Sequence, residues 1–386
     1  MKSTVLSNSL TSALIITTHQ AANVLMPLYA IEYFSASMPQ VGYLFTAFFL
    51  SSTFSKIFAG IFVKQKYLKH LLILSTLLIT ISIASYVIVP SVAYLMLVRI
   101  VHGIGFGITI TACLTIASLI VEKEMQSYSV SLFAVFTVIG LIVGPLVGTF
   151  GTLFYDIPKT LLIVSFISLI AFFLAAYTIK DRMLKCSYDD MHEIVLKRFD
   201  FVREGWFMLN FMAYFAYALI YGTLVAYVPP YVKQNFGLND YYITALFFIF
   251  SIFSLASRII LTKHSPTEFL KKILVFSLGI SILMMALISF SNSLIMFVIE
   301  FPLIGLGHGF IYPITALFIS KNSPQDKRFM ANTIYLISFD LGNAIGPIIA
   351  SSLTTILPLN LVFVAMTVFP TMLLIYLLMN IRSLNC

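Results

Sequence analysis

The sequence predicts an all-α membrane protein whose twelve transmembrane helices form two pseudo-symmetric six-helix bundles. Of its 386 residues 60% are hydrophobic and only 10% are charged, whereas soluble domains carry about a quarter charged residues. Its apolar runs reach the length of about 20 residues that a helix needs to cross a hydrocarbon core. The second half of the chain also repeats landmarks of the first half at a constant offset.

Twelve apolar segments follow one another along the chain. Spanning β-strands would be about 10 residues long with alternating polarity, so strands are excluded as the main element. A mixed-charge stretch separates the sixth and seventh segments, and it divides the chain into an N-terminal bundle at 1–179, a cytoplasmic linker at 180–203 and a C-terminal bundle at 204–386. The segments are 9–31, 39–62, 68–89, 91–114, 126–149, 157–179, 204–230, 239–262, 269–290, 292–320, 327–354 and 357–381.

An internal repeat relates the two bundles at an offset of 202 residues. No gap is needed over more than a hundred residues. Duplicated bundles of membrane helices are typical of secondary transporters that alternate access around a central site. The repeated landmarks are Gly103, Gly105 and Gly107 with Gly305, Gly307 and Gly309, Gly140 with Gly342, Gly144-Pro145 with Gly346-Pro347, Pro27 with Pro229, Tyr29 with Tyr231 and Lys56 with Arg258.

The net charge of +8 is explained by membrane topology. If both termini are cytoplasmic, all but three of the 23 lysines and arginines fall on the inner side, the exceptions being Lys159, Lys233 and Arg99. An excess of Lys and Arg marks cytoplasmic loops. We therefore expect a multi-pass protein of the cell membrane in contact with lipid, with cytoplasmic termini and no nucleic-acid partner.

Signatures of enzyme chemistry are missing from the sequence. No Gly-Lys dipeptide occurs, so a phosphate-binding loop is excluded. His192-Glu193 begins a zinc-protease pattern, but Leu196 stands where the second histidine belongs. The three cysteines show neither metal nor disulfide spacing. We expect no catalytic residue, no metal site, no cofactor and no enzymatic activity.

A glycine-proline run marks the fifth segment. Gly140, Gly144, Pro145 and Gly148 form the pattern G-x-x-x-G-P-x-x-G. Glycines four residues apart let another helix approach closely, and a proline inside a helix frees a carbonyl and bends the helix. We interpret this run, with its repeats Gly342, Gly346 and Pro347, as a packing seam with a pivot that serves gating.

These motifs resemble the Major Facilitator Superfamily, and within it the drug/proton antiporter branch of twelve helices. That branch carries G-x-x-x-G-P-x-x-G-G in its fifth helix, where this chain has Thr149 for the last glycine. Its fourth helix carries an arginine four residues before a glycine, matched by Arg99 and Gly103. The loop from Gly60 to Lys69 departs from the family's G-x-L-x-D-R-x-G-R, because Lys64 replaces the aspartate.

Polar side chains inside the apolar segments are the candidate substrate site. A charged side chain in the hydrocarbon region costs at least ~2.5 kcal/mol and normally faces a cavity or a partner. The resemblance implies that helices 1, 4, 7 and 10 line a central cavity. The expected substrate-binding residues on these helices are His19, Asn23, Arg99, His102, Phe106, Asn210, Tyr214, Tyr217 and Tyr221.

Two acids lie well inside segments and are the candidates for proton coupling. Glu300 is on a helix that lines the cavity by resemblance, and Asp340 lies near the repeated glycines. A carboxylate shielded from water can be neutral in one state and charged in another. Arg99 lies one residue from repeat equivalence with Glu300, and we expect Arg99 to pair with a carboxylate in one conformation.

The sequence favours a proton-coupled exporter of a small amphiphilic organic molecule, either a drug or an endogenous metabolite such as a metallophore. Its partners would be the substrate, protons and lipid, and we expect a monomer. A proton-coupled importer of a nutrient on the same fold remains open, because only the glycine-proline motif favours export. A non-transporting membrane receptor and an intramembrane enzyme are further alternatives.

Overall fold

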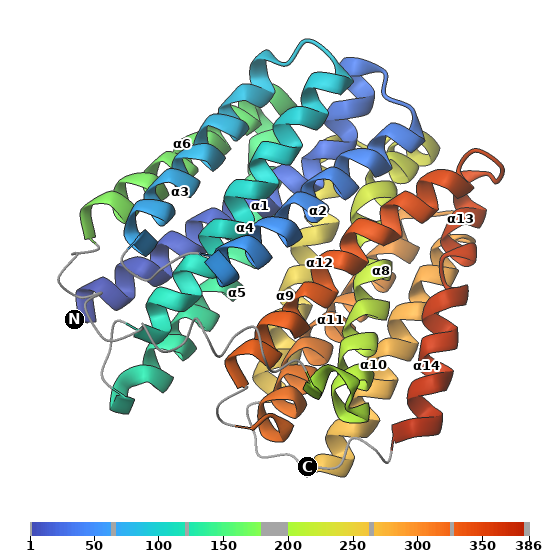
Figure 1. Cartoon of the computed structure of the whole chain (residues 1–386). Helices are drawn as coiled ribbons and strands as arrows, with labels where there is room; N and C mark the ends of the chain where they lie inside the picture. The colour runs from blue at the N-terminus through green and yellow to red at the C-terminus, as the bar shows by residue number, and fades with distance from the viewer. Residues whose placement is uncertain are drawn as a thin grey trace. The chain divides into compact units, whose positions relative to one another are not determined.

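The computed structural model is all-helical over the residues that it describes (Figure 1). The described residues are 2–62, 67–119, 123–178, 200–261, 266–324 and 328–381. Within them, twelve helices are long and apolar enough to cross a membrane. The predicted fold class and number of spans are therefore confirmed.

The helices follow the predicted segments closely. In the first half they are α1 (Lys2–Phe34), α2 (Met38–Phe62), α3 (Leu68–Ser85), α4 (Val92–Leu119), α5 (Lys123–Phe154) and α6 (Ile157–Thr178). In the second half they are α8 (Gly205–Phe236), α9 (Asp240–Ile260), α10 (Thr267–Ile288), α11 (Leu294–Asn322), α12 (Arg328–Leu353), α13 (Leu359–Ala365) and α14 (Val368–Asn380).

Three elements differ from simple spanning helices. The third span ends in the 3-10 turn η2 (Tyr86–Ile88), and the short 3-10 helix η4 (Asp200–Arg203) precedes α8. The last span is divided between α13 and α14, where the amide of Thr367 bonds to the carbonyl of Val364, three residues back. Such i→i+3 bonds tighten a helix into 3-10 geometry.

Two compact units divide the chain. The first comprises Met1–Ala36, Ala47–His192 and Asn239–Phe248, and the second comprises Ser37–Thr46, Glu193–Leu238 and Ile249–Cys386. The predicted bundle boundaries stay a prediction, because most of the linker at 180–203 lies outside the described residues. Residues 63–66 of the loop between α2 and α3 lie outside them as well.

The internal repeat is reproduced in how the helices of each unit pack. In the first unit α1 packs chiefly on α5 and α3 on α4, and in the second unit α8 packs on α12 and α10 on α11. A Cβ added at Gly103 would lie 2.3 Å from the carbonyl oxygen of Phe48, and one at Gly305 would lie 2.3 Å from that of Phe250. Gly305 and Phe250 are the repeat mates of Gly103 and Phe48, so each unit builds the same close helix contact.

The first helix of each unit ends in the same way. Ser35 follows α1 with φ 51°, and its repeat mate Gly237 follows α8 with φ 61°. Their amides bond to the carbonyls of Ile31 and Lys233, which are again repeat mates. A left-handed residue of this kind, usually glycine, commonly closes a helix. The first copy adopts this conformation with a serine.

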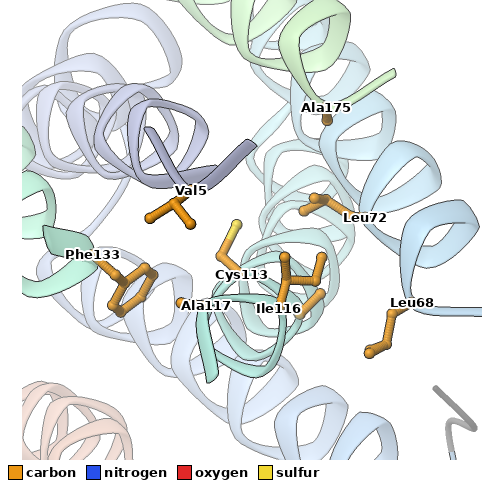
Figure 2. Close-up of a cluster of buried hydrophobic side chains, with 9 residues drawn as sticks. Val5, Leu68, Leu72, Cys113, Ile116, Ala117, Phe133 and Ala175 are labelled. Carbon is orange, nitrogen blue, oxygen red and sulfur yellow. The ribbon is translucent and has the colours of Figure 1, made fainter. Parts of the chain in front are cut away.

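Apolar side chains from five helices fill one end of the first unit (Figure 2). Val5 of α1, Leu72 of α3 and Phe133 of α5 surround Cys113 and Ile116 of α4, and Ala175 of α6 closes the cluster. Cys113 is a free thiol that packs as a small apolar side chain. Asn23 and Arg99, described below, lie on two of the same helices, α1 and α4.

Candidate functional site

The buried guanidinium of Arg99 organises the candidate site in the first unit. Arg99 is 0% exposed on α4, and its Nη2 donates to the Asn23 Oδ1 of α1 at 2.9 Å. Its guanidinium carbon lies 4.4 Å from the centroid of the Phe48 ring of α2. A cation over an aromatic face is attracted by the ring quadrupole, more strongly once it is desolvated. Two predicted residues, Asn23 and Arg99, are thus brought into contact.

His102 is joined to the same guanidinium through Tyr86. The Tyr86 hydroxyl lies 3.0 Å from His102 Nδ1, and Arg99 hydrogen-bonds to this hydroxyl. Because a guanidinium can only donate, the phenol oxygen accepts from Arg99 and its own proton points to Nδ1. The neutral imidazole then carries its proton on Nε2, which is buried and pairs with no described residue.

His19 packs against two phenylalanine rings beside this cluster. Its ring is stacked on Phe48 at 4.6 Å and tilted on Phe106 at 4.2 Å between centroids. The His102 ring is 6.0 Å away, and His19 Nδ1 pairs with no described residue. All five residues predicted for helices 1 and 4 therefore form one buried group.

In the second unit, His308 of α11 is the centre of an aromatic group. Tyr217 and Tyr221 of α8 lie 5.2 and 5.5 Å from its ring, and Phe250 of α9 lies 5.3 Å away. Arg258 Nη2 is 3.5 Å from His308 Nε2. The predicted tyrosines Tyr217 and Tyr221 thus meet a histidine and an arginine that were outside the predicted site.

The other residues predicted on α8 have different surroundings. Tyr214 is stacked on Tyr335 at 5.0 Å and on Phe339 at 4.9 Å, both from α12. Asn210 donates to the carbonyl of Trp206 one turn earlier in its own helix. Tyr214 therefore belongs to a second aromatic stack, which Phe339 connects to Tyr221 at 5.8 Å, and Asn210 is set apart from both groups.

The ring groups of the two units are repeat copies of each other. His19, Phe48 and Phe106 correspond to Tyr221, Phe250 and His308 at the offset of 202 residues. The flanking cations correspond too, since Lys56 Nζ lies 5.7 Å from the Phe106 ring and Arg258 bonds to His308. Each unit thus holds three mutually contacting rings and a cation, and histidine replaces a different one of the three rings in each copy.

The two predicted coupling acids are both buried. Glu300 is 4% exposed on α11, where Ser291 Oγ donates to its Oε1 at 2.5 Å and no described residue pairs with its Oε2. Asp340 is 3% exposed on α12, directly after Phe339. Among the described residues, no group of three or more His, Cys, Asp or Glu side chains could hold a metal ion.

The glycine-proline runs lie where helices cross closely. A Cβ at Gly140 or Gly144 would come within 2.6 or 2.8 Å of carbonyl oxygens of α1, and one at Gly342 or Gly346 within 2.7 or 2.5 Å of carbonyl oxygens of α8. At Gly148 the nearest atom, in Thr244, would be 3.6 Å away, which is ordinary contact. Pro145 and Pro347 lie inside continuous helices, α5 and α12.

Comparison with known proteins identifies the fold that holds these groups. The family model of the Major Facilitator Superfamily matches residues 9–328 and 211–383. The chain belongs to the Major Facilitator Superfamily. It is therefore a multi-pass membrane protein of a transporter superfamily, and this fold implies a small-molecule substrate.

Solved structures of other superfamily members share the fold at low sequence identity. A bacterial homologue of the human lysosomal transporter Spinster, in an inward-facing and occupied conformation, is 15% identical with a TM-score of 0.77, over 98% of this chain and 96% of that chain. The nucleoside transporter NupG is 14% identical with a TM-score of 0.75, over 98% and 99%. No curated protein matches the chain.

Several partners of the predicted residues were missed by sequence reasoning. His308 was available through the repeat, as the mate of the predicted Phe106. Phe48, Phe250 and Arg258 lie on α2 and α9, which carried no predicted site residue. Tyr86 carried no signal, because it lies at the end of an apolar segment, 16 residues from the histidine that it contacts. Ser291 precedes α11 and gave no helical pattern with Glu300.

Proposed function

We propose that this superfamily member is a proton-coupled antiporter that exports a small amphiphilic organic molecule by alternating access, a drug or an endogenous metabolite such as a metallophore. The observation that carries the proposal is the pair of buried ring groups, each with a cation, inside membrane-spanning helices. Charged and ionisable side chains are costly inside a membrane and are normally retained there for function.

Export through the drug/proton antiporter branch is favoured by the run of Gly140, Gly144, Pro145 and Gly148. Two of these glycines meet carbonyl oxygens of α1 and the proline lies inside α5, which is the arrangement expected of a packing seam with a bend. The proposal places the protein in the cell membrane with both termini in the cytoplasm, acting as a monomer on substrate and protons.

Proton coupling is assigned to Glu300 and Asp340, the buried acids of α11 and α12. Glu300 has one carboxylate oxygen held by Ser291 and a second oxygen that no described residue pairs with. Such a group can take up and release a proton without breaking a salt bridge. A proton on either acid would alter the charge inside the second unit and so bias the conformational equilibrium.

The test is transport into inside-out vesicles that contain the purified full-length protein, with an imposed pH gradient and a panel of drugs and cell metabolites. We expect a panel compound to accumulate against its gradient while protons leave the vesicles. Glu300→Gln or Asp340→Asn should abolish uphill accumulation and keep downhill exchange. Retained uphill transport in both variants would exclude these acids as the proton-coupling groups. Accumulation of a compound while protons enter the vesicles would indicate an importer. No flux of any compound would indicate a receptor.

A further inference from the structure

The polar group around Arg99 has no counterpart in the repeated unit. The offset of 202 residues relates Asn23, Tyr86, Arg99 and His102 to four apolar side chains that are no more than 2% exposed, Val225, Ile288, Phe301 and Ile304. The surrounding frame is nevertheless the same, since Gly103 and Gly305 make equivalent contacts. The scaffold therefore packs without these polar residues, and their presence in the first unit calls for a reason other than folding.

We propose that Arg99, His102 and Asn23 form a binding site for the carboxylate group of the transported solute, a proposal that rests on the proposed function and narrows its substrate to an organic anion. The carboxylate would take the acceptor position on Arg99 that Asn23 Oδ1 holds. It would also accept a hydrogen bond from the N–H at His102 Nε2.

The acceptor position on Arg99 has the shape and size of a carboxylate oxygen. Asn23 presents a planar amide whose Oδ1 accepts from Nη2 at 2.9 Å, and a carboxylate is the planar, charged equivalent of that amide. Arg99 is a cation, and a carboxylate brings it a full opposite charge that the neutral amide of Asn23 lacks. A charged solute therefore competes well with the neutral side chain. A planar acceptor favours carboxylate over tetrahedral phosphate.

A second donor lies beside the guanidinium. Tyr86 accepts from Arg99 and faces His102 Nδ1 at 3.0 Å, which leaves the imidazole proton on the buried Nε2. A buried donor that no described residue accepts from is unusual and suits an acceptor that comes with the solute. The guanidinium and this N–H together offer two donors. They match the two acceptor oxygens of a carboxylate, whereas an uncharged amide has only one acceptor oxygen.

The neighbouring rings indicate what the carboxylate is attached to. His19 packs on Phe48 and Phe106 at centroid distances of 4.6 and 4.2 Å, and these two rings lie 5.6 Å apart, so the wall next to Arg99 is a cluster of flat rings. Aromatic groups pack favourably on such surfaces. An aromatic carboxylate matches both parts of the site, and benzoate is the simplest probe of this class.

The experiment measures benzoate binding to the purified full-length protein in detergent, by the shift of its thermal unfolding temperature. We expect a saturable rise with benzoate and no rise with benzamide or inorganic phosphate. Asn23→Asp supplies a permanent carboxylate to Arg99 and should weaken benzoate binding by about tenfold or more, the value of a hydrogen bond to a charged group. Its control is Asn8→Asp, the same change at another buried position of α1, which should leave benzoate binding intact.

A further variant copies the second unit into the first. Asn23→Val, Tyr86→Ile, Arg99→Phe and His102→Ile together should fold, since their repeat mates pack in the equivalent frame, and should lose the benzoate response. An absent benzoate shift in the native protein, or a shift that survives Asn23→Asp, would overturn the proposal. Benzoate binding without any vesicle flux would support the carboxylate site and contradict the transport function. Vesicle flux of other solutes without benzoate binding would support the transport function and contradict the carboxylate site.

Discussion

Single glycines decide how closely the helices of each unit approach one another. In the motif of α5, Gly144 faces the carbonyl oxygen of Thr17 and the amide nitrogen of Ala21, at 2.8 and 3.1 Å from the position of an added Cβ. Backbone atoms of a packed helix cannot move aside as a flexible side chain can. The same motif contains Gly148, whose neighbouring Thr244 methyl would be at 3.6 Å.

This contrast yields a prediction for two alanine substitutions. Gly144→Ala should lower the stability of the protein by about 1–3 kcal/mol, the usual cost of overpacking, because α1 and α5 must separate. Gly148→Ala is the matched control within the same motif and should change stability by less than about 0.5 kcal/mol. Thermal unfolding of both variants in detergent measures the difference, and equal effects would show that the seam is not at Gly144.

At the scale of one element, α6 begins with a charged cap. Asp156 Oδ1 accepts from the amide of Lys159 at 2.9 Å, and Oδ2 meets Lys159 Nζ at 2.9 Å. These hydrogen bonds from Lys159 hold the pKa of Asp156 below its ordinary value of 3.8. Both side chains are well exposed, 42% for Asp156 and 67% for Lys159, so the charge adds little beyond the cap.

Two substitutions of Asp156 separate the hydrogen bond to the Lys159 amide from the ion pair with Lys159 Nζ. Asp156→Ala should cost about 1 kcal/mol of stability, the value of a helix cap, while Asp156→Asn keeps an acceptor and should cost only a few tenths of a kcal/mol. Because the folded pKa is lowered, the ionic contribution is complete above pH 3.8 and disappears as the pH falls through the folded value. Unfolding temperatures of native and Asn proteins should therefore converge in acid, and a gap that persists there would contradict this reading.

Sequence reasoning predicted the elements better than the contacts between them. Apolar run length alone located all twelve spans, because a bilayer sets the length of a helix. It did not show the break between α13 and α14, which has no glycine or proline at residues 366 and 367 to mark it. Helical spacing placed His19 with Asn23 and Arg99 with His102 and Phe106, and the family resemblance brought the two helices together. Tyr86, which links Arg99 to His102, comes from another element and follows no such spacing.

Over the whole molecule, the duplication supplies one frame to two units that carry different chemistry. Both units keep the glycine contacts, the ring groups and the left-handed helix ends. Among the described residues, only the first holds an arginine that is 0% exposed and bonded to an asparagine, and only the second holds the buried acids Glu300 and Asp340. Under the proposed function, one unit would hold the solute and the other would respond to protons.

The measurement that tests this account most directly is the accessibility of single cysteines from the two sides of the membrane. Phe106→Cys and His308→Cys, which are repeat mates at the ring groups, would each be introduced into a protein whose three native cysteines are replaced. A membrane-impermeant maleimide would then be applied to right-side-out and inside-out vesicles under opposite proton gradients. Alternating access predicts labelling from one face in a given gradient and from the other face when the gradient is reversed. Equal labelling from both faces at once, or labelling from neither under any gradient, would contradict the account.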